Sequence, residues 1–444
     1  MPYIPHTPEE TRQMLDTIGV SDIDALFADI APALRPKSFN LPDGLSEMEV
    51  MAHIERLAEK NVVDVVSFLG AGFYDHHIPA AVDTLTNRGE FATAYTPYQP
   101  EASQGTLQAI FEYQTAISRL FDMECVNASV YDGGSAIFEA MMMGVRATKR
   151  KKLVISEALS PIYRIMLASY TKNLKLDLVT VPHRDGSTDL DALKAAVDSE
   201  TAAVVVQNPN FFGNVNDFTE LFDHARSVKA KSVISVYPVM QSILKTPGEM
   251  GADIAVAEGQ SLGMPLSFGG PYLGIMTCTK KMVRQMPGRI VGRTVDTEGR
   301  TGYVLTLQAR EQHIRRQRAT SNICSNQSLC ALRALAYMGL LGPCGMQRVA
   351  EKSMENAQYA AQRLTKIPGI SLLTDAPFCN EFAIRLPIPA YELVDQLTER
   401  GFVPGFPLGR YFKGLENCLL VACTEKHSRQ DLGILAEMVG GVIR

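Results

Sequence analysis

Residues 201–238 have the sequence TAAVVVQNPNFFGNVNDFTELFDHARSVKAKSVISVYP. Two short β-branched runs in this stretch, Ala202–Gln207 and Ser232–Tyr237, are separated by an amphipathic helical segment. Consecutive apolar positions in each run are typical of strands that are covered on both faces. Because strands that alternate with helices usually lie parallel, this stretch predicts part of a mostly parallel sheet buried on both sides.

The same alternation continues on either side of this stretch. Four further runs have the same β-branched character: Leu153–Ser156, Leu176–Val181, Asp253–Ala257 and Tyr272–Cys278. A chain of 444 residues exceeds the roughly 250–300 residues at which a single core stops growing, so we expect more than one domain. The first is predicted to be a large α/β domain over residues 61–325.

The pattern changes after residue 325. A helical segment over about 326–364 precedes three runs that resemble strands and two that resemble helices. The strands are expected at Ser371–Thr374, Glu381–Leu386 and Cys418–Thr424, and the helices at Tyr391–Arg400 and Arg429–Val442. This arrangement predicts a smaller C-terminal α+β domain over residues 326–444.

The first 60 residues are predicted to form a helical arm. Thr7-Pro8-Glu9-Glu10 has the pattern of a helix start, since Thr can cap, Pro suits the first turn and acidic residues favour the helix dipole. A second helix is expected from Ser46, which has Glu49 three residues later. A proline-containing connector, Arg35–Gly44, lies between them.

Composition excludes several classes of protein. A net charge of −5 argues against bulk attraction to nucleic acid, and the densest basic run, His313–Arg318, lacks interleaved aromatic residues. We therefore interpret that run as a solvated helix face or a subunit contact. The eight cysteines include no C-x-x-C pair, which suits a reducing compartment, and no metal site is expected. The N-terminus has no apolar signal core, and no apolar run approaches the 18 or so residues of a membrane helix, so we expect a cytoplasmic protein.

A large α/β domain followed by a small C-terminal domain resembles the fold-type I pyridoxal-phosphate enzymes. A site of that class requires three elements. A glycine-rich turn that begins a helix binds the phosphate through backbone N–H groups. An acid at a strand end pairs with the pyridinium nitrogen, and a lysine farther along forms the Schiff base.

The first element is present in part. Tyr131-Asp132-Gly133-Gly134-Ser135-Ala136 precedes a helical stretch, Ile137–Thr148, and Gly133, Gly134 and Ser135 could offer N–H groups to a phosphate. An ordinary helix cap after a glycine turn explains the same residues, and the sequence leaves both interpretations open.

The other two elements are absent. No Asp or Glu lies between Asp223 and Glu249, so the expected strand ends in Tyr237-Pro238 where the acid would stand. Residues 251–271, GADIAVAEGQSLGMPLSFGGP, have the frame that would carry the lysine. Gln260 or Ser261 occupies the lysine position, depending on the direction of counting, and neither can form an imine. The nearest lysines, Lys245 and Lys280, fit the frame poorly.

Four blocks of sequence resemble the glycine cleavage P-proteins. They are FLGAGFYDHHIP at 68–79, TAYTPYQPEASQGTLQAIFEYQTAISRLFDMECVNASVYDGGSA at 93–136, residues 251–271, and HIRRQRATSNICSNQ at 313–327. In this family the enzyme is one long chain or two. The resemblance implies the alpha subunit of the split form, which lacks the lysine that the beta subunit carries.

The resemblance also implies a reaction and its partners. The family releases CO₂ from glycine and transfers the aminomethyl group to the lipoyl arm of H-protein. Pyridoxal phosphate would be bound mainly by the beta subunit, in an alpha-two beta-two assembly. The role left for this chain is to shape the pocket, the lipoyl channel and the interface.

Several residues are candidates for a pocket contribution. Tyr95, Tyr98, Gln99 and Glu101 lie in a loop stiffened by two prolines, and a hydroxyl or amide there could hold the glycine carboxylate or amine. A rigid interface loop is the alternative interpretation. Three further candidates are His77, Ser321 and Asn322.

Each of these three also has a plainer explanation. His76 and His77 are adjacent and should point to opposite faces, so one metal ion would rarely take both, and simple hydrogen bonding is the alternative. Ser321 and Asn322 could equally begin a helix. Cys324 has no identifiable activating base, so it is not expected to be a nucleophile.

Three hypotheses about function follow. The first is an alpha subunit of glycine decarboxylase that anchors no cofactor but contributes to the pocket. The second is a structural or regulatory pseudo-enzyme subunit without pocket residues. The third is a stand-alone pyridoxal enzyme that uses Lys245 or Lys280.

Overall fold

The computed structural model describes residues 6–36, 38, 40–61, 64–267, 269–325 and 327–443. The chain divides into two compact units, Met1–Val63 and Asp64–Arg444. Phe268 and Asn326, which fall within two of the family-like blocks and at the start of the predicted C-terminal domain, lie outside the described residues.

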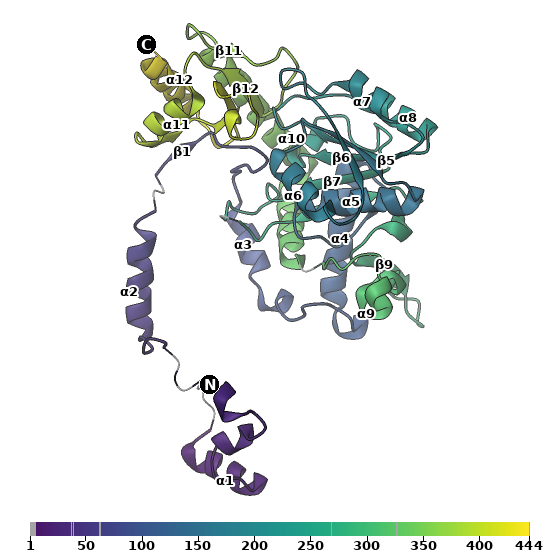
Figure 1. The fold of residues 1–444 in the computed structure, drawn as a ribbon, viewed down its shortest axis with the longest axis vertical. Coiled ribbons are helices and arrows are strands. Elements are labelled where there is room, and N and C mark those ends of the chain that lie inside the picture. The colour runs from purple at the N-terminus through teal and green to yellow at the C-terminus, as the bar shows by residue number, and fades with distance from the viewer. Residues whose placement is uncertain are drawn as a thin grey trace. The chain divides into compact units, whose positions relative to one another are not determined.

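The described part of the first unit consists of helices without a buried core. Helices α1 (Pro8–Ile18) and α2 (Glu47–Ala58) contain no buried residue, and short 3₁₀ helices lie between them (Figure 1). Thr7 and Ser46 each form a complete capping box, with Glu10 and Glu49 respectively. Both predicted helix starts are therefore confirmed.

The second unit contains a seven-stranded sheet with the order β2-β8-β7-β6-β5-β3-β4. Its strands are β2 (Cys125–Val126), β3 (Lys152–Ser156), β4 (Asp177–Val181), β5 (Thr201–Asn208), β6 (Lys231–Val236), β7 (Ile254–Glu258) and β8 (Gly274–Cys278). Strands β3 to β7 pair parallel, whereas β8 is antiparallel to both β7 and β2. The predicted mostly parallel sheet is confirmed, with one antiparallel side.

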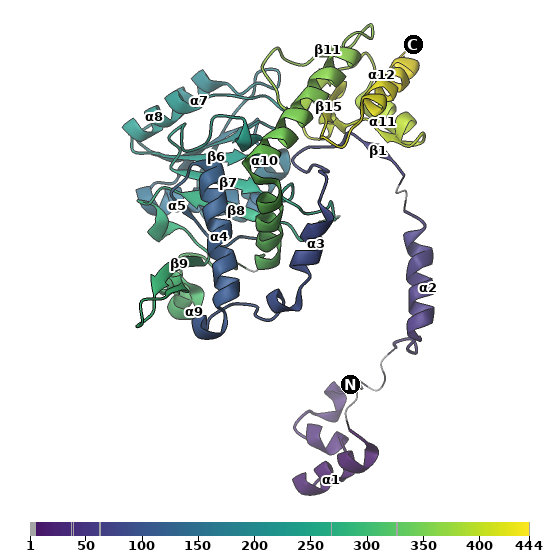
Figure 2. The same ribbon diagram turned by 180° about the vertical axis from the view of Figure 1, so that it is seen from behind.

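Alternate residues of the central strands enter different cores, as expected for a sheet covered on both faces. On β5, Val204 and Val206 pack with helix α4 (Gln104–Phe121), whereas Val205 packs with helix α5 (Gly133–Thr148). The opposite views of Figures 1 and 2 show these two helices on opposite faces of the sheet. Burial of both faces explains why the strand sequences are continuously apolar.

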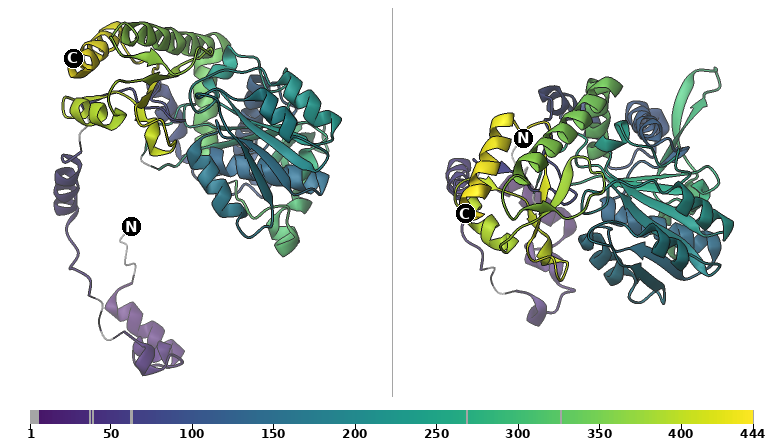
Figure 3. Two further views of the ribbon diagram at one scale, coloured as in Figure 1. Left: turned by 45° about the horizontal axis from the view of Figure 1, so that its top comes forward. Right: turned by 90° about the horizontal axis from the view of Figure 1, so that it is seen from above.

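A long helix leads to a second, antiparallel sheet (Figure 3). Helix α10 (Ser328–Leu364) is bent at Gly342, whose φ is 61°, next to Pro343. The sheet has the order β11-β12-β15-β14 and is followed by the C-terminal helix. Its elements are β11 (Ser371–Leu372), β12 (Glu381–Arg385), α11 (Ala390–Thr398), β14 (Phe406–Pro407), β15 (Cys418–Ala422) and α12 (Arg429–Ile443).

The predicted C-terminal elements are present, although β11 and β15 end two residues earlier than expected. Strand β1 (Val66–Ser67) pairs with β13 (Phe402–Val403), so residues just after the arm contact the C-terminal part of the chain. The sequence did not predict this pairing. The proposed division into residues 1–60, 61–325 and 326–444 remains a prediction.

Helix α10 differs from the sequence-based expectation, and the basic run His313–Arg318 agrees with it. Helix α10 is long and apolar enough to cross a membrane by length and composition, contrary to the expectation that no such run exists. Its residues Ala334 and Tyr337 are fully buried in the main core, and 28% of its most apolar 18-residue window is buried in the structure. The basic run His313–Arg318 lies in short exposed helical turns, which agrees with either a solvated helix face or a subunit contact.

Candidate functional site

The position expected to carry a lysine is occupied by a structural glutamine. Gln260 and Ser261 follow β7, and their side chains are buried. The Gln260 Oε1 accepts the Tyr74 N–H at 3.0 Å, while its Nε2 donates to the carbonyls of Tyr74 and Met264 at 3.1 and 2.8 Å. All of its polar atoms therefore serve to hold the surrounding backbone.

The position expected to carry an acid is occupied by a buried tyrosine. Tyr237 follows β6, its hydroxyl is hydrogen-bonded to the His76 Nε2, and its ring centroid lies 4.4 Å from that of Tyr74. Burial raises the pKa of the Tyr237 hydroxyl well above its usual value. A neutral phenol in this place cannot supply the negative charge that a pyridinium nitrogen requires.

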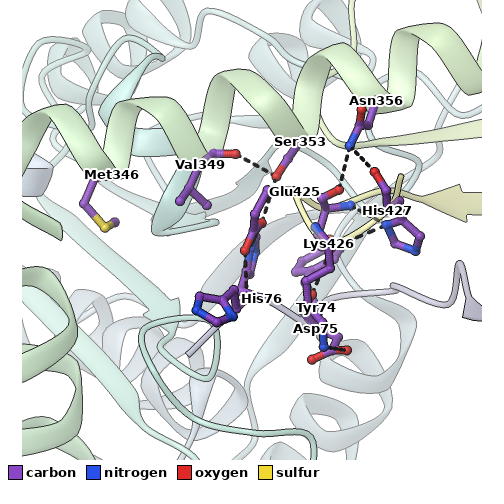
Figure 4. Close-up of polar contacts among 12 residues, drawn as sticks. Tyr74, Asp75, His76, Met346, Val349, Ser353, Asn356, Glu425, Lys426 and His427 are labelled. Atoms are coloured by element: carbon purple, nitrogen blue, oxygen red, sulfur yellow. Dashed lines mark hydrogen bonds and ion pairs between the residues drawn. The ribbon is translucent and has the colours of Figure 1, made fainter. Parts of the chain in front are cut away.

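His76 continues this network to the C-terminal part of the chain. Its Nδ1 lies 2.6 Å from the Glu425 Oε2, and the His77 backbone N–H donates to the Glu425 Oε1 at 2.7 Å (Figure 4). Burial would raise the pKa of Glu425, but hydrogen bonds from His76 and His77 and the charge of His76 hold it below its usual value. The side chain of His77 is exposed, whereas His76 is buried.

The glycine turn begins helix α5 directly, and the N–H groups of Gly133 and Ser135 have partners within the chain. Asp132 caps the helix by accepting the Ser135 N–H at 2.7 Å. The Gly133 N–H donates to the Glu258 Oε2 at 2.9 Å. Of the two interpretations that the sequence left open, the structure contains the ordinary cap, together with a second carboxylate that the sequence did not indicate.

Two buried carboxyl groups lie beside one small cavity. The cavity has a volume of about 70 Å³ and is lined by residues that include Tyr74, Tyr163, Tyr237, Glu258, Asn380 and Glu381. Burial raises the pKa of Glu258 and that of Glu381 to about 7, although backbone hydrogen bonds oppose the shift in both. Pockets for drug-sized ligands usually measure about 300–1,000 Å³.

Pyridoxal phosphate does not fit these residues. The volume would hold a few water molecules, the helix N-terminus already binds a carboxylate, and Gln260 offers no amine. Among the described residues, no group of three or more His, Cys, Asp or Glu side chains could hold a metal ion.

The predicted tyrosine loop lies in a separate, exposed cluster. Tyr95 is 72% exposed, and its hydroxyl lies 3.4 Å from the Cys324 Sγ. The Arg289 guanidinium lies 3.5 Å from the Tyr98 hydroxyl and 5.7 Å from the centre of its ring. The Cys324 N–H donates to the Tyr131 hydroxyl at 3.2 Å, which connects the cluster to the turn before α5.

The other predicted residues are distributed around this cluster. Gln99 and Glu101 are exposed in the same loop, and Asn322 is exposed near Cys324. The Ser321 hydroxyl is hydrogen-bonded to Glu139 of α5. None of these side chains lines the cavity beside Glu258 and Glu381. Arg289 was missed by the sequence analysis, since nothing local associates it with Tyr98, 191 positions earlier.

The fold defines the class of this protein as that of the fold-type I pyridoxal-phosphate enzymes. Its structure is similar to that of glutamate decarboxylase from Lactobacillus brevis, with a TM-score of 0.70 at 16% identity over 93% of this chain and 96% of that one. A sphingosine-1-phosphate lyase from Burkholderia pseudomallei gives a TM-score of 0.67 at 15% identity, over 93% and 95% of the chains. At these identities the likeness concerns the fold alone.

The chain belongs to the glycine cleavage system P-protein family, whose model matches residues 1–439. A crystal structure of glycine decarboxylase (P-protein) of the glycine cleavage system, in inhibitor-bound form, has a TM-score of 0.93 at 44% identity, over the whole of both chains. The chain is also 73% identical, over the full length of both, to the probable glycine dehydrogenase (decarboxylating) subunit 1 of Nitratidesulfovibrio vulgaris (strain Hildenborough). The corresponding protein of Geotalea uraniireducens (strain Rf4) is 52% identical over the same extent. The predicted family, fold class and enzyme class are confirmed.

Proposed function

We propose that this chain is the subunit of glycine decarboxylase that does not anchor the cofactor. A partner subunit would carry the lysine, and the assembled enzyme would release CO₂ from glycine and pass the aminomethyl group to the lipoyl arm of H-protein. The names of the relatives support glycine decarboxylation, and the designation subunit 1 supports a partner chain.

One observation carries the assignment of the non-anchoring role. The side chains at the two candidate lysine positions, Gln260 and Ser261, are 1% and 3% exposed and cannot form an imine. The hydrogen bonds of Gln260 to Tyr74 and Met264 give its amide a structural purpose. The third hypothesis, a stand-alone enzyme, loses further support because Lys245 is hydrogen-bonded to Asp217 and Thr219 at an exposed site.

The exposed tyrosine cluster supports a contribution to a pocket completed by the partner. Tyr95 and Tyr98 project large aromatic side chains with hydroxyl groups to the surface, and Arg289 brings a positive charge beside them. Hydroxyl and guanidinium groups are suitable donors to a carboxylate such as that of glycine. Gln99, Glu101, His77, Ser321 and Asn322 are proposed as lesser contributors to the same pocket.

The remaining features of the proposal concern the assembly. Pyridoxal phosphate would be bound mainly by the partner, in an alpha-two beta-two tetramer, and the enzyme would act in the cytoplasm. Most soluble oligomers have closed symmetry, most often a twofold axis, and a dimer of two alpha–beta pairs fits that pattern. The alternative, a structural or regulatory subunit without pocket residues, predicts the same assembly but no effect of substitutions at Tyr95 or Tyr98.

The first test is whether the chain forms an imine. The purified full-length chain is mixed with excess pyridoxal phosphate, treated with borohydride and digested for mass analysis. We expect no stoichiometric adduct at any lysine, whereas the partner subunit treated in the same way should be modified at one lysine. A stoichiometric adduct on this chain, at Lys245 or Lys280 for example, would overturn the proposal.

A further inference from the structure

The N-terminus of helix α5 is where a fold of this class would bind a phosphate, and in this chain an internal carboxylate lies there. Glu258 is the last residue of β7, and it is only 8% exposed. Its Oε2 accepts the N–H of Gly133, the first residue of α5, at 2.9 Å. Its Oε1 accepts the N–H groups of Gln260 at 3.0 Å and Leu273 at 3.2 Å.

These three contacts give Glu258 the coordination expected for a bound anion. Several backbone N–H groups converge on its two oxygens, and one of them belongs to a helix start, where the dipole favours negative charge. A phosphate at the same place would need the same N–H of Gly133. It would also meet two negative charges at close range, since Asp132 lies at the cap of the same helix.

Neighbouring side chains close the remaining space around the turn. A methyl group placed on Gly133 would lie 2.9 Å from the Glu258 Cβ and 2.7 Å from the Tyr163 hydroxyl. One placed on Gly134 would lie 2.9 Å from the end of the Met166 side chain. Tyr163 and Met166 both belong to helix α6 (Pro161–Thr171). Glu258 and Tyr163 thus occupy the volume in front of the turn that a ligand would enter.

A second polar group of the same cavity still has hydrogen-bonding capacity. The Asn380 side chain is 1% exposed, it lines the cavity together with Glu258, and its Nδ2 has no hydrogen-bond partner among the residues that the structure describes. This buried donor points to a place where a small polar ligand could be bound if the carboxylate were removed.

We infer that Glu258 is a built-in anion that occupies the phosphate position at the start of α5 and excludes phosphate esters from this chain. The inference deepens the proposed function and rests on it, because it names the residue that keeps the cofactor out of the non-anchoring subunit. The converse follows: a chain without this carboxylate should contain a latent anion site, formed by the Gly133 N–H and the neighbouring donors.

The experiment measures the binding of inorganic phosphate to the full-length chain. Wild type and Glu258→Ser are titrated with phosphate by calorimetry above pH 8, where Glu258 is ionised, with sodium chloride of equal ionic strength as the reference. We expect no saturable binding to the wild type and binding at least about tenfold tighter to the variant, accompanied by a phosphate-dependent rise in Tm. Glu220→Ser is the matched control, since the Glu220 side chain is 92% exposed, and it should behave as the wild type.

Three further variants keep the test decisive. Glu258→Asp retains the charge and should still exclude phosphate. Glu258→Gln keeps the shape of the side chain, so it still fills the volume in front of the turn and should also bind no phosphate. Glu258→Ala empties that volume as the serine variant does, and phosphate should raise its Tm. If a folded Glu258→Ser or Glu258→Ala chain binds phosphate no better than the wild type, the inference is wrong.

The outcome is distinguishable from failure of the proposed function. A borohydride-stable adduct of pyridoxal phosphate on a lysine of the wild-type chain would contradict the non-anchoring role itself. The absence of such an adduct, together with no gain of phosphate binding in the variants, would contradict only the role of Glu258.

Discussion

The side chain of Gln260 and the main chain of Tyr74 are hydrogen-bonded in both directions. The Tyr74 N–H donates to the glutamine Oε1 at 3.0 Å, and the glutamine Nε2 donates to the Tyr74 carbonyl at 3.1 Å. The two residues are 186 positions apart, so this pair fastens the first family-like block, residues 68–79, to the loop after β7. A residue at one of the two positions expected to carry a Schiff-base lysine thus has a structural role here.

The first prediction concerns restoring a lysine at that position. Gln260→Lys should not create a cofactor site, because Glu258 and Tyr163 still fill the phosphate position and the cavity is small. The Tyr74 N–H would lose its acceptor, which costs about 1–3 kcal/mol of unfolding free energy for a buried group. Urea unfolding and borohydride trapping measure the two effects. Gln347→Lys, at an exposed position of α10, should change neither. An adduct at Lys in position 260 would contradict the prediction.

The second prediction concerns the pH dependence of stability. The pKa of Glu258 and that of Glu381 are about 7 in the folded chain, above the usual value of 4.5. Between these values the folded state retains protons that the unfolded state has released. The free energy of unfolding should therefore fall by roughly 3 kcal/mol for each group as pH rises toward 7. Above that pH it should level off.

Substitution of one group isolates its share of this effect. Glu381 accepts hydrogen bonds from the Ala71 N–H at 2.7 Å and the Tyr74 hydroxyl at 2.8 Å. Glu381→Gln removes the titration, so the loss of stability between about pH 5 and pH 8 should be roughly half that of the wild type. Urea unfolding at several pH values measures it, with Glu298→Gln as the exposed control. If the dependence of unfolding free energy on pH is the same in Glu381→Gln as in the wild type, the pKa of this carboxyl is not raised in the folded chain.

The third prediction concerns the buried pair of His76 and Glu425. The pKa of Glu425 is lowered in the folded state, so its contribution to stability is present above the unfolded pKa and is lost as pH falls through the folded one. Glu425→Gln should lower the unfolding free energy by about 1–3 kcal/mol near neutral pH. The difference from the wild type should shrink in acid, as measured by thermal unfolding. Glu399→Gln, at the exposed residue that follows α11, should have little effect. A difference that does not depend on pH would contradict the prediction.

Much of the fold could be predicted because its elements are encoded locally. The central strands have continuously apolar sequences since Val204, Val205 and Val206 enter cores on alternating faces. Thr7 and Ser46 each mark the start of a helix by a capping pattern with a glutamate only three residues later. The pairing of β1 with β13 could not be predicted, because two-residue strands have too short a pattern and their partners are far apart in sequence.

The site shows the same division between local and distant information. The lack of a lysine at Gln260 and of an acid at Tyr237 is visible in the sequence, since both depend on spacing within one segment. The hydrogen bonds around these positions could not be seen in the sequence, because they join distant residues. Glu258 accepts a hydrogen bond from Gly133, 125 positions earlier, and Glu381 accepts one from Tyr74, 307 positions earlier. An acid at the end of a buried strand, as Glu258 is, could have drawn attention to the helix start beside it.

The fourth prediction concerns the exposed tyrosines. If Tyr95 supplies a hydrogen bond to a charged group of the substrate in a pocket completed by the partner, Tyr95→Phe should lower kcat/KM of the assembled enzyme roughly 10- to 100-fold. The phenylalanine preserves the apolar contact area, so the assembly should elute from size exclusion as the wild type does.

Tyr98→Phe should have a smaller effect, because its hydroxyl already lies 3.5 Å from Arg289. Tyr391→Phe, which removes a hydroxyl from a side chain 47% exposed on α11, is the control. Full activity in both loop variants, with the assembly intact, would favour a structural or regulatory subunit, whereas loss of assembly in Tyr95→Phe would assign the loop to the interface.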